Sequence, residues 1–435
     1  MPNTPTIVAL SSGSLPAGVA VIRLSGPQSF AAVTALTGAL PPPRTLTLRM
    51  LRDPKTGTAL DQGLVAIFPA PHSFTGDDCA ELQIHGSPAG VKAVLATLLT
   101  LTGITLAGPG DFTRRAFENG KLDLTAIEGL GDLLAAETES QRKQALARLE
   151  GGLGQQVGVW RDILLDARAE IEAQLDFSDE DDVPFSLPPH FREDLTALST
   201  TLGEALAGFE RGRLQREGFR VVLAGAPNAG KSSLLNRLAG SDLAIVTAEA
   251  GTTRDTKDVS IDLGGALVTL TDTAGLRETD SLAEAEGVRR AHSAIEAADL
   301  VLHLLAPDTE TTHLGNIAVP IWTLASKSDL GAQAHPVDLA FSAHTGAGIE
   351  DLLARLKTHI EAQIGSEPML VSHLRDQQAL AAAITHIDQA IARIDQLELC
   401  AEELRRAADT LAGLIGLMDS EAVLDRLFAG FCIGK

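Results

Sequence analysis

A glycine-rich stretch, GAPNAGKS, occupies Gly225–Ser232 and has the spacing G-x-x-x-x-G-K-S. The apolar run FRVVLAG leads into this stretch, and a helical pattern follows it. In that setting the backbone N–H groups of the loop surround phosphates at the N-terminus of a helix. We expect Lys231 to reach the β- and γ-phosphates and Ser232 to bind Mg²⁺. The motif therefore predicts a nucleoside triphosphate site.

Two later motifs fit the phosphate side of the same site. DTAG, Asp272–Gly275, ends an apolar run, so its aspartate is expected to face Mg²⁺ and its glycine N–H the γ-phosphate. GTTRD, Gly251–Asp255, offers Thr253 as a second hydroxyl for Mg²⁺.

Two further motifs fit the base. SKSD, Ser326–Asp329, ends another apolar run, and its aspartate is expected to accept hydrogen bonds from both N–H donors of guanine. SAH, Ser342–His344, is expected to close over the base. DTAG alone is often a plain turn, but all the motifs in this order indicate guanine-nucleotide binding.

The elements that position these motifs lie in residues 217–363. Apolar, strand-like runs occur at FRVVLAG, ALVTLTDTAG, LVLHLLA, PIWTLASKSD and LAFSA, with helical stretches between them. Alternation of this kind predicts a parallel sheet with crossover helices.

Residues 1–120 predict a separate α/β domain. Strands are expected at TIVAL, GVAVIRLSG, RTLTLRML, GLVAIF and CAELQIHG, with Gly and Pro between them. A helix is expected at about Pro88 to Leu101.

Residues 121–216 and 364–435 are both helical in pattern. Thr125 and Glu128 have the spacing of a capping box, and helix then continues to about Leu175. The acidic stretch DFSDEDDVPFSLPP predicts a solvated loop, and a helix from about Arg192 to Arg213 follows it.

The last part carries one apolar stripe with helical spacing, formed by Leu380, Ile384, Ile387, Ile391, Ile394 and Leu397. We expect the helices before and after residues 217–363 to pack together, with the α/β unit inserted between them.

Composition limits the function classes. The chain has 35 basic and 57 acidic residues and a net charge of −22, which argues against a polyanion-binding surface over the whole protein. Its 3 cysteines are far apart and contain no CxxC pair, so we expect a reducing, cytoplasmic compartment. The first basic residue is Arg23 and no apolar run approaches ~18 residues, so neither a signal peptide nor a membrane span is expected.

The chain resembles the tRNA-modification GTPase family MnmE, also called TrmE, over nearly its whole length. The resemblance rests on IVAL…VAVIRLSG, SFTGDDCAELQIHG, FTRRAFENGKLDLTAIEGL, GAPNAGKSSLLN, AIVTAEAGTTRD, DTAGLRET and the final FCIGK. It implies an N-terminal folate-binding-like domain, a central helical domain with a Ras-like GTPase domain inserted, and a homodimer with transient GTPase-domain dimerisation.

The same resemblance implies a function. The family acts with a flavin-dependent partner, MnmG, and adds an aminomethyl-type group to C5 of the wobble uridine of certain tRNAs. A folate of the 5-formyltetrahydrofolate type supplies the one-carbon unit, and GTP hydrolysis drives the conformational cycle.

Motifs and resemblance together give the expected residues at GTP: Asn228, Ala229, Gly230, Lys231, Ser232, Ser233, Thr247, Thr252, Thr253, Asp272, Thr273, Ala274, Gly275, Lys327, Asp329, Ser342, Ala343 and His344. In this family K⁺ is bound at positions that correspond here to Asn228, Thr247, the carbonyl of Glu249, and Thr252. A cation there offsets charge that develops in phosphoryl transfer.

The family's water-orienting acid corresponds to Glu284, with Glu286 as the neighbouring alternative. Its folate site corresponds to Arg23, Glu81, Lys121 and Lys435. Cys432 in the terminal FCIGK is the candidate thiol for the modification chemistry, with simple packing as its alternative role.

This sequence departs from the family at four places. SSGSLPAG replaces a Gly- and Arg-rich loop, which predicts a different closure beside the folate. Ser326 replaces Asn and predicts a weaker tie between the base loop and the Gly-rich loop. SAH ends in His rather than Lys or Arg, and Glu249 is unusual, although a carbonyl ligand does not depend on its side chain.

The competing interpretation is a GTPase switch in ribosome assembly without modification chemistry.

Overall fold

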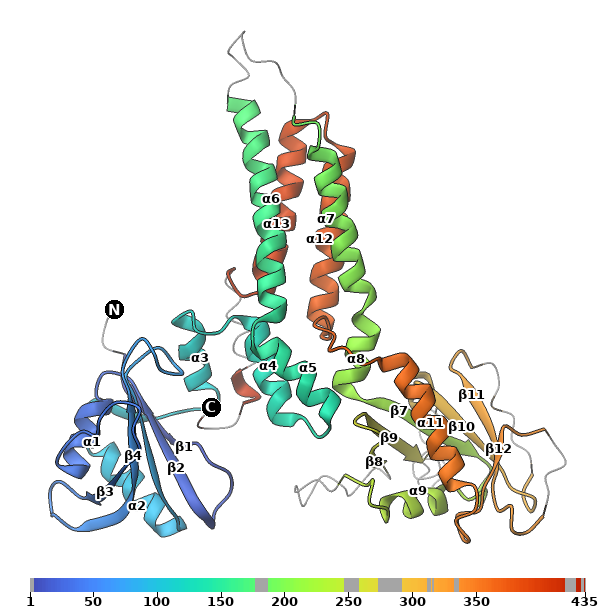
Figure 1. Ribbon diagram of the computed structural model, residues 1–435, viewed down its shortest axis with the longest axis horizontal. Helices are drawn as coiled ribbons and strands as arrows, with labels where there is room; N and C mark the ends of the chain where they lie inside the picture. Colours follow the sequence, from blue (N-terminus) through green and yellow to red (C-terminus); the bar gives the residue numbers. More distant parts are fainter. Residues whose placement is uncertain are drawn as a thin grey trace, which may run out of the picture. The chain divides into compact units, whose positions relative to one another are not determined.

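The computed structural model describes residues 4–176, 187–245, 258–272, 292–310, 314, 317–331, 336–418, 428–431 and 434 (Figure 1). The chain forms two compact units. The first unit consists of Met1–Gly131, Leu149–Asp162 and Ala408–Lys435, and the second of Asp132–Arg148 and Ile163–Ala407. The protein is thus a multidomain chain with α/β and helical parts, and the four-part division expected from the sequence stays a prediction.

The first unit contains a six-stranded sheet in the order β3-β4-β5-β2-β1-β6. Its strands are β1 Thr6–Leu10, β2 Ala17–Ser25, β3 Thr47–Arg52, β4 Ala59–Phe68, β5 Cys79–Gly86 and β6 Ile104–Leu106. The five strands expected from the sequence are confirmed. The three-residue strand β6 was not predicted, because a segment so short carries no alternating pattern.

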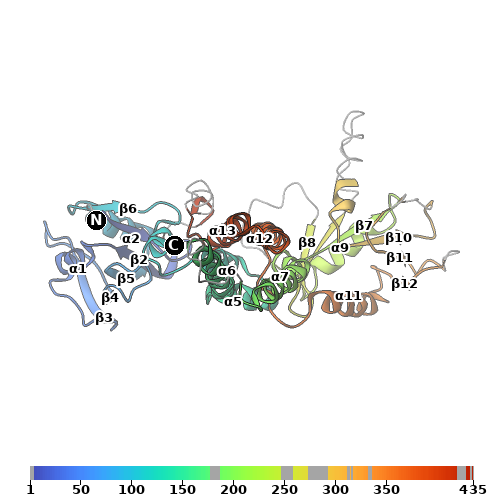
Figure 2. The ribbon, with the colours of Figure 1, turned by 90° about the horizontal axis from the view of Figure 1, so that it is seen from above.

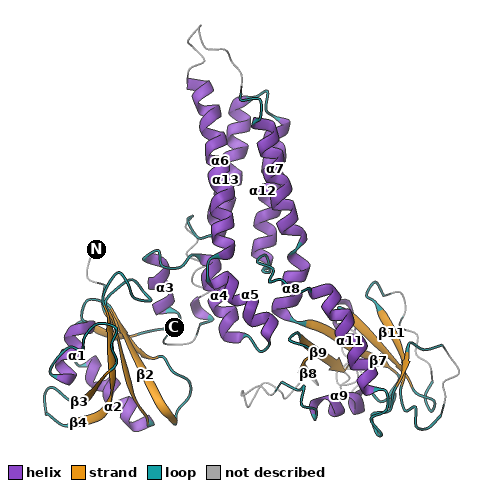
Figure 3. Ribbon diagram, viewed as in Figure 1, coloured by secondary structure: helices purple, strands orange, loops and turns teal. Residues whose placement is uncertain are grey.

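Helices pack on one face of this sheet. They are α1 Ser29–Thr37 and α2 Pro88–Leu99; α3 Asp111–Glu118 follows β6, and its Phe112 packs in a separate cluster with Ile7 and Ala9 of β1 (Figure 3). Leu36 of α1 and Leu98 of α2 share a core with Ile22 of β2. Helix α2 begins as expected: Pro88 is its first residue and the Ser87 hydroxyl accepts from Gly90 N at 3.1 Å. Helices α1 and α3 were not predicted.

Helix α4 Leu124–Ala135 begins differently from the prediction. The Asp123 carboxylate accepts hydrogen bonds from Ala126 N at 2.8 Å and from the Thr125 hydroxyl at 2.7 Å. Thr125 is therefore inside the first turn, and the predicted capping box from Thr125 to Glu128 is wrong. The aspartate before the helix acts as its N-cap instead.

After α4 the described chain continues with α5 Glu139–Leu149, α6 Gly152–Asp176 and α7 Phe191–Ala207. Helix α6 confirms the expected end near Leu175. Instead of one helix from Arg192 to Arg213, the chain forms α7 and α8 Phe209–Glu217, which meet at Gly208. A Cβ at Gly208 would lie 2.2 Å from Met369 Cε, so a larger residue there would have to displace the end of this flexible side chain.

The second unit contains a sheet in the order β12-β11-β10-β7-β9-β8. Its strands are β7 Phe219–Gly225, β8 Asp258–Asp262, β9 Leu267–Asp272, β10 Leu300–Leu305, β11 Ile321–Ala325 and β12 Leu339–Ala340. Helices α9 Lys231–Ala239 and α11 Ile349–Ile364 belong to this part. The sheet is parallel except for β8, which pairs antiparallel with β9 and corrects the expectation of a fully parallel sheet.

The last long helices are α12 Leu374–Ala392 and α13 Leu397–Leu414. The apolar stripe is therefore divided by a turn at residues 393–396. Helix α12 packs against α7, so helices before and after the second sheet lie side by side (Figure 2). Cys400 is fully buried in α13, and burial raises the pKa of its thiol to about 11. Among the described residues, none of the helices has both the length and the apolar content that a membrane span requires.

Candidate functional site

The glycine-rich loop connects β7 to α9. Gly225 has φ 143°, and a Cβ there would lie 2.5 Å from Leu304 O, so only glycine fits. Asn228 and Gly230 also have positive φ, at 63° and 91°. The loop thus turns sharply and places α9 with Lys231 as its first residue. This is the strand–loop–helix arrangement that phosphate binding requires.

Lys231 lies within this loop. Its side chain is buried, and its Nζ donates to Gly225 O and Ala226 O, both at 2.8 Å. The ammonium group is therefore held against the loop carbonyls, in the place where the sequence predicts a phosphate contact.

Oxygen ligands for a divalent cation meet beside the loop. The Ser232 hydroxyl donates to Asp272 Oδ2 at 2.6 Å, and Asp272 is buried at the end of β9. A hydroxyl next to a carboxylate is the oxygen set that Mg²⁺ prefers, so the residues present fit this ion. The other expected ligand, Thr253, lies outside the described residues.

A cavity of about 600 Å³ lies where the base is expected. It is lined by residues expected at GTP, namely Gly230, Ser233, Lys327, Asp329, Ser342, Ala343 and His344, and by Ser326 and Phe341. Asn236, Arg237 and Leu330 also line it and were not foreseen. The structure therefore brings the two base motifs together with the start of α9.

The carboxyl group of Asp329 in this cavity favours its ionised form, which accepts hydrogen bonds. The Ser342 hydroxyl and a backbone N–H hold the pKa of its carboxyl below the ordinary value, with smaller contributions from the charges of His344 and Lys327. An ionised carboxylate at this place can accept from two N–H donors of a base.

Lys327 is held beside Asp329 by a residue that the sequence did not single out. Its Nζ contacts both carboxylate oxygens of Asp308, at 2.7 and 3.0 Å, and its backbone has φ 52°. Asp308 follows β10 and carries no motif, so only the fold reveals this pairing.

Ser326 ties the base motif to the glycine-rich loop. It is buried, and its hydroxyl lies 2.6 Å from Ala229 O and 3.2 Å from Leu305 O. The short hydroxyl thus reaches the loop carbonyl directly, while the expectation that this tie is weaker than one made by Asn stays a prediction.

Removing this tie should weaken nucleotide binding. We expect Ser326→Ala to lose about 1 kcal/mol, or about fivefold in GDP affinity, because a buried hydrogen bond is lost and a carbonyl loses a partner. Stopped-flow dissociation of a fluorescent GDP analogue measures the effect. Ser328→Ala is the matched control, since its backbone bond to Phe341 O is kept. An unchanged dissociation rate in Ser326→Ala would show that the tie does not support the site.

A second candidate site lies on the sheet of the first unit. Arg23 and Glu81 are opposite each other on β2 and β5, and Arg23 Nε and Nη2 lie 3.2 and 3.0 Å from Glu81 Oε1. The guanidinium also stacks on Phe74 and Phe112, with 5.5 and 5.9 Å to the ring centroids. A carboxylate, a cation and two aromatic rings fit a flat, polar pteridine.

The expected folate residues are only partly brought together. Lys121 is exposed after α3 and, among the described residues, makes no hydrogen bond or ion pair with Arg23 or Glu81. Phe74 and Phe112 were missed as site residues, although both lie in the quoted motifs SFTGDDCAELQIHG and FTRRAFENGKLDLTAIEGL.

The end of the chain docks on the same unit. The Ser11 hydroxyl donates to Gly434 O at 2.9 Å, and a Cβ at Gly434, which has φ 98°, would lie 2.3 Å from Leu10 O. Phe428 is buried and packs on Gly110, two residues before Phe112. Leu10 lies opposite Ile22, the neighbour of Arg23, so the docked tail passes close to this strand.

Several expected residues lie outside the described part of the chain, so the structure does not place them. They are Thr247, Glu249, Thr252, Thr253, Thr273, Ala274, Gly275, Glu284, Glu286, Cys432 and Lys435.

Solved structures resemble part of the chain. The G-domain of FeoB from Methanococcus jannaschii is 22% identical with a TM-score of 0.25, and covers 33% of this chain and 98% of that chain. Aquifex aeolicus Era bound to GDP·AlF4⁻ is 25% identical with a TM-score of 0.26, and covers 40% of this chain and 66% of that chain.

Whole-length relatives are much more similar. The proteins named tRNA modification GTPase MnmE from Azorhizobium caulinodans and Brucella canis are 49% and 48% identical to this chain. The alignments cover 100% and 99% of this chain, and 99% and 98% of those proteins. A family model described as MnmE helical domain matches residues 124–432, and one described as GTP-binding protein TrmE N-terminus matches residues 6–121. The chain therefore belongs to the MnmE (TrmE) family, whose curated members are named tRNA modification GTPases.

Proposed function

We propose that this protein hydrolyses GTP in the course of tRNA modification. The observation that carries the proposal is the single site formed by the glycine-rich loop, the Ser232–Asp272 pair and the cavity around Asp329. It occurs in a chain that matches proteins named tRNA modification GTPase MnmE from end to end.

The modification proposed is at C5 of the wobble uridine of certain tRNAs. With a flavin-dependent partner of the MnmG type, the protein adds an aminomethyl or carboxymethylaminomethyl group. A folate of the 5-formyltetrahydrofolate type supplies the one-carbon unit when bound. The Arg23–Glu81 pair and its two stacked phenylalanines support a site for its pteridine. Lys121 and Lys435 remain proposed partners of its acidic tail.

In GTP hydrolysis, the chain's own residues orient the phosphates and the attacking water. Lys231 and the loop N–H groups bind phosphates, and Ser232 with Thr253 holds Mg²⁺. Asn228, whose φ of 63° already bends the loop, is a proposed K⁺ ligand together with Thr247, Thr252 and the carbonyl of Glu249. Glu284 is the proposed water-orienting acid.

We also propose a cytoplasmic homodimer formed through the N-terminal domain, with transient contacts between GTPase domains. Support comes from the edge of the first sheet, where Leu46, Leu48, Met50 and Leu64 are all exposed. Leu48 and Leu64 lie opposite each other on β3 and β4, so they form one continuous apolar patch. Unpartnered apolar patches on a sheet face are typical of protein–protein contacts.

The arrangement proposed for the chain is a GTPase domain inserted into a helical domain. Its support is the packing of α7 on α12, which precede and follow the second sheet in the chain. A folate-binding-like fold for residues 1–120 is proposed on the family resemblance and on the Arg23–Glu81 pair.

The experiment that tests this function uses Cys432 and Cys400 as a matched pair. We expect cells lacking the protein to lose the wobble-uridine modification, and the wild-type and Cys400→Ser chains to restore it. Cys432→Ser should fail, because Ser keeps the volume but loses most nucleophilicity. Mass analysis of tRNA nucleosides gives the readout, and GTP hydrolysis of the purified variants shows that they are folded.

Two outcomes would contradict the proposal in different ways. Unchanged wobble uridine in cells without the protein would favour a GTPase switch in ribosome assembly. Full restoration by Cys432→Ser would reduce this cysteine to packing while leaving the modification function in place.

A further inference from the structure

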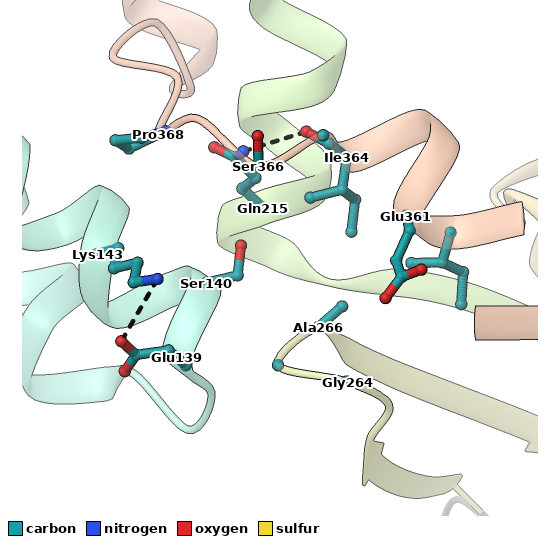
Figure 4. A pocket seen from close by; sticks show the side chains of 13 residues that line it. Glu139, Ser140, Lys143, Gln215, Gly264, Ala266, Glu361, Ile364, Ser366 and Pro368 are labelled. Carbon is teal, nitrogen blue, oxygen red and sulfur yellow. Dashed lines mark hydrogen bonds and ion pairs between the residues drawn. The ribbon is translucent and has the colours of Figure 1, made fainter. Parts of the chain in front are cut away.

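The turn between β8 and β9 touches helix α5. Gly264, labelled in Figure 4, and Gly265 form the turn with φ 71° and 90°. Gly265 O accepts a hydrogen bond from Ser140 N at 3.0 Å. Ser140 is the second residue of α5, so this backbone bond joins the tip of the β8–β9 hairpin to the first turn of the helix.

The other end of the hairpin lies at the nucleotide site. Strand β9 ends at Asp272, whose carboxylate accepts the Ser232 hydroxyl, and it pairs along its length with β7. Its six residues span about 20 Å at roughly 3.3 Å per residue. A paired strand is stiff over that length, so a displacement at Asp272 is carried to the turn.

Side chains of helix α5 form hydrogen bonds to two chain segments, one that leads into the second sheet and one that follows it. Gln141 Nε2 donates to Arg216 O at 2.9 Å, on the segment that leads into β7. Gln144 Nε2 donates to Gly212 O at 2.9 Å and to Met369 O at 2.8 Å, so it joins that segment to the one that follows α11. Any movement of α5 therefore acts on both connections.

Gln215 fastens the two connections to each other. Its Nε2 donates to Ile364 O at 3.2 Å and to Glu367 O at 2.8 Å, while its Oε1 accepts from Met369 N at 2.8 Å. The side chain is buried, so water competes little for these bonds. The two connections are therefore held firmly together at Gln215, and we call this region the pivot.

The contact at the turn is different, because it borders a cavity of about 520 Å³. Figure 4 shows Glu139, Ser140 and Lys143 on one side of the cavity and Gly264 with Ala266 on another. Ile364, Ser366 and Pro368 also line the cavity, near the pivot. Space beside a single backbone bond lets the turn shift, whereas a packed interface would resist it.

We propose that the β8–β9 hairpin is a lever that carries the nucleotide state from Asp272 to helix α5 through the Gly265–Ser140 contact. The inference rests on the proposed GTPase function and adds a route for its regulation. A bound nucleotide displaces α5 only if it binds more tightly to the protein with the turn in one position than in another. Helix α5 then turns about the connections that Gln215 fastens.

The first test uses the unaltered full chain. Hydrogen exchange of peptides covering residues 137–149 is compared in GDP and in a non-hydrolysable GTP analogue. We expect the amides in the first turn of α5 to differ several-fold in exchange rate between the two states. Equal rates in a protein that binds and hydrolyses GTP would overturn the lever.

The second test locks the contact. A Cβ at Gly265 would lie 3.7 Å from Glu139 Cβ, within the range of about 3.5–4.5 Å that a disulfide requires. We expect the oxidised Glu139→Cys/Gly265→Cys chain to bind GTP but to lose the nucleotide-dependent difference in α5, and reduction to restore it. The two single variants, oxidised in parallel, control for the positive φ at Gly265 and for the native cysteines.

The outcomes separate this proposal from the proposed function. Absence of GTP hydrolysis in the wild-type chain would reject the function itself. Normal hydrolysis, together with an undiminished difference in the oxidised double variant, would reject the lever alone.

Discussion

Asp329→Asn is expected to change the nucleotide preference of this protein from GTP toward XTP. The ionised carboxylate accepts from two N–H donors of guanine, whereas an amide presents one acceptor and one donor. Xanthine carries a carbonyl in place of the 2-amino group and so suits the amide. We expect GTP affinity to fall about 100-fold or more, because unpaired polar groups in a binding site are strongly disfavoured.

Competition between GTP and XTP against a fluorescent GDP analogue measures this change. Asp351→Asn is the matched control, because Asp351 lies in the exposed first turn of α11 and does not line the cavity. An Asp329→Asn chain that still prefers GTP would remove Asp329 from the base site.

The second large effect concerns stability. Arg148 of α5 and Asp376 of α12 form an ion pair at 2.7 Å, and both side chains are completely buried. Asp376 also accepts from Ser372 N and His373 N at the start of α12. We expect Asp376→Asn to lower the free energy of unfolding by about 3–5 kcal/mol, because Arg148 becomes an uncompensated buried charge.

Urea unfolding followed by tryptophan fluorescence measures this loss. A Trp160→Phe background leaves Trp322 of the second unit as the only tryptophan. Adding Arg148→Met to Asp376→Asn should recover part of the stability, since the unpaired charge is gone. Glu402→Gln, which breaks an exposed pair with Arg405, should change nothing measurable. Equal stability of wild type and Asp376→Asn would show that the pair is not coupled to folding.

The Arg148–Asp376 pair also makes the stability of the protein depend on pH. Burial alone would raise the pKa of Asp376, but the charge and hydrogen bond of Arg148 and the amides of residues 372 and 373 hold it below its usual value of 3.8. A lowered pKa contributes stability above pH 3.8, and this contribution is lost as the pH falls through the lower folded value. The difference in the free energy of unfolding between wild type and Asp376→Asn should therefore stay constant near neutral pH and become smaller only in acid.

The nucleotide motifs were readable because each is contiguous and its backbone geometry demands particular residues. Gly225 has no room for a Cβ, and Gly230 has positive φ, so the glycines mark the loop directly. The strands beside it are long apolar runs. In contrast, β8 is a five-residue strand with one fully buried residue, Ile261, and its pattern does not distinguish it from a loop.

Contacts between distant segments could not be read in this way. Arg148 and Asp376 are 228 residues apart, and each resembles an ordinary exposed charge in a helical sequence. Arg23 and Glu81 were proposed as separate ligands on the family resemblance, while the register of β2 and β5 makes them partners. Register and helix packing depend on the whole fold, and no local pattern encodes them.

The three glutamines that fasten the second sheet to the helices bond to main-chain groups. Gln141, Gln144 and Gln215 recognise the path of the connecting segments without recognising their side chains. During evolution the connecting residues are therefore free to change, apart from Gly212, where a Cβ would lie 2.1 Å from Val371 O. Because these bonds go to main-chain groups, most side-chain changes in the connecting segments leave them intact. The attachment of the second sheet to the helices can therefore persist while the sequence of the connecting segments changes.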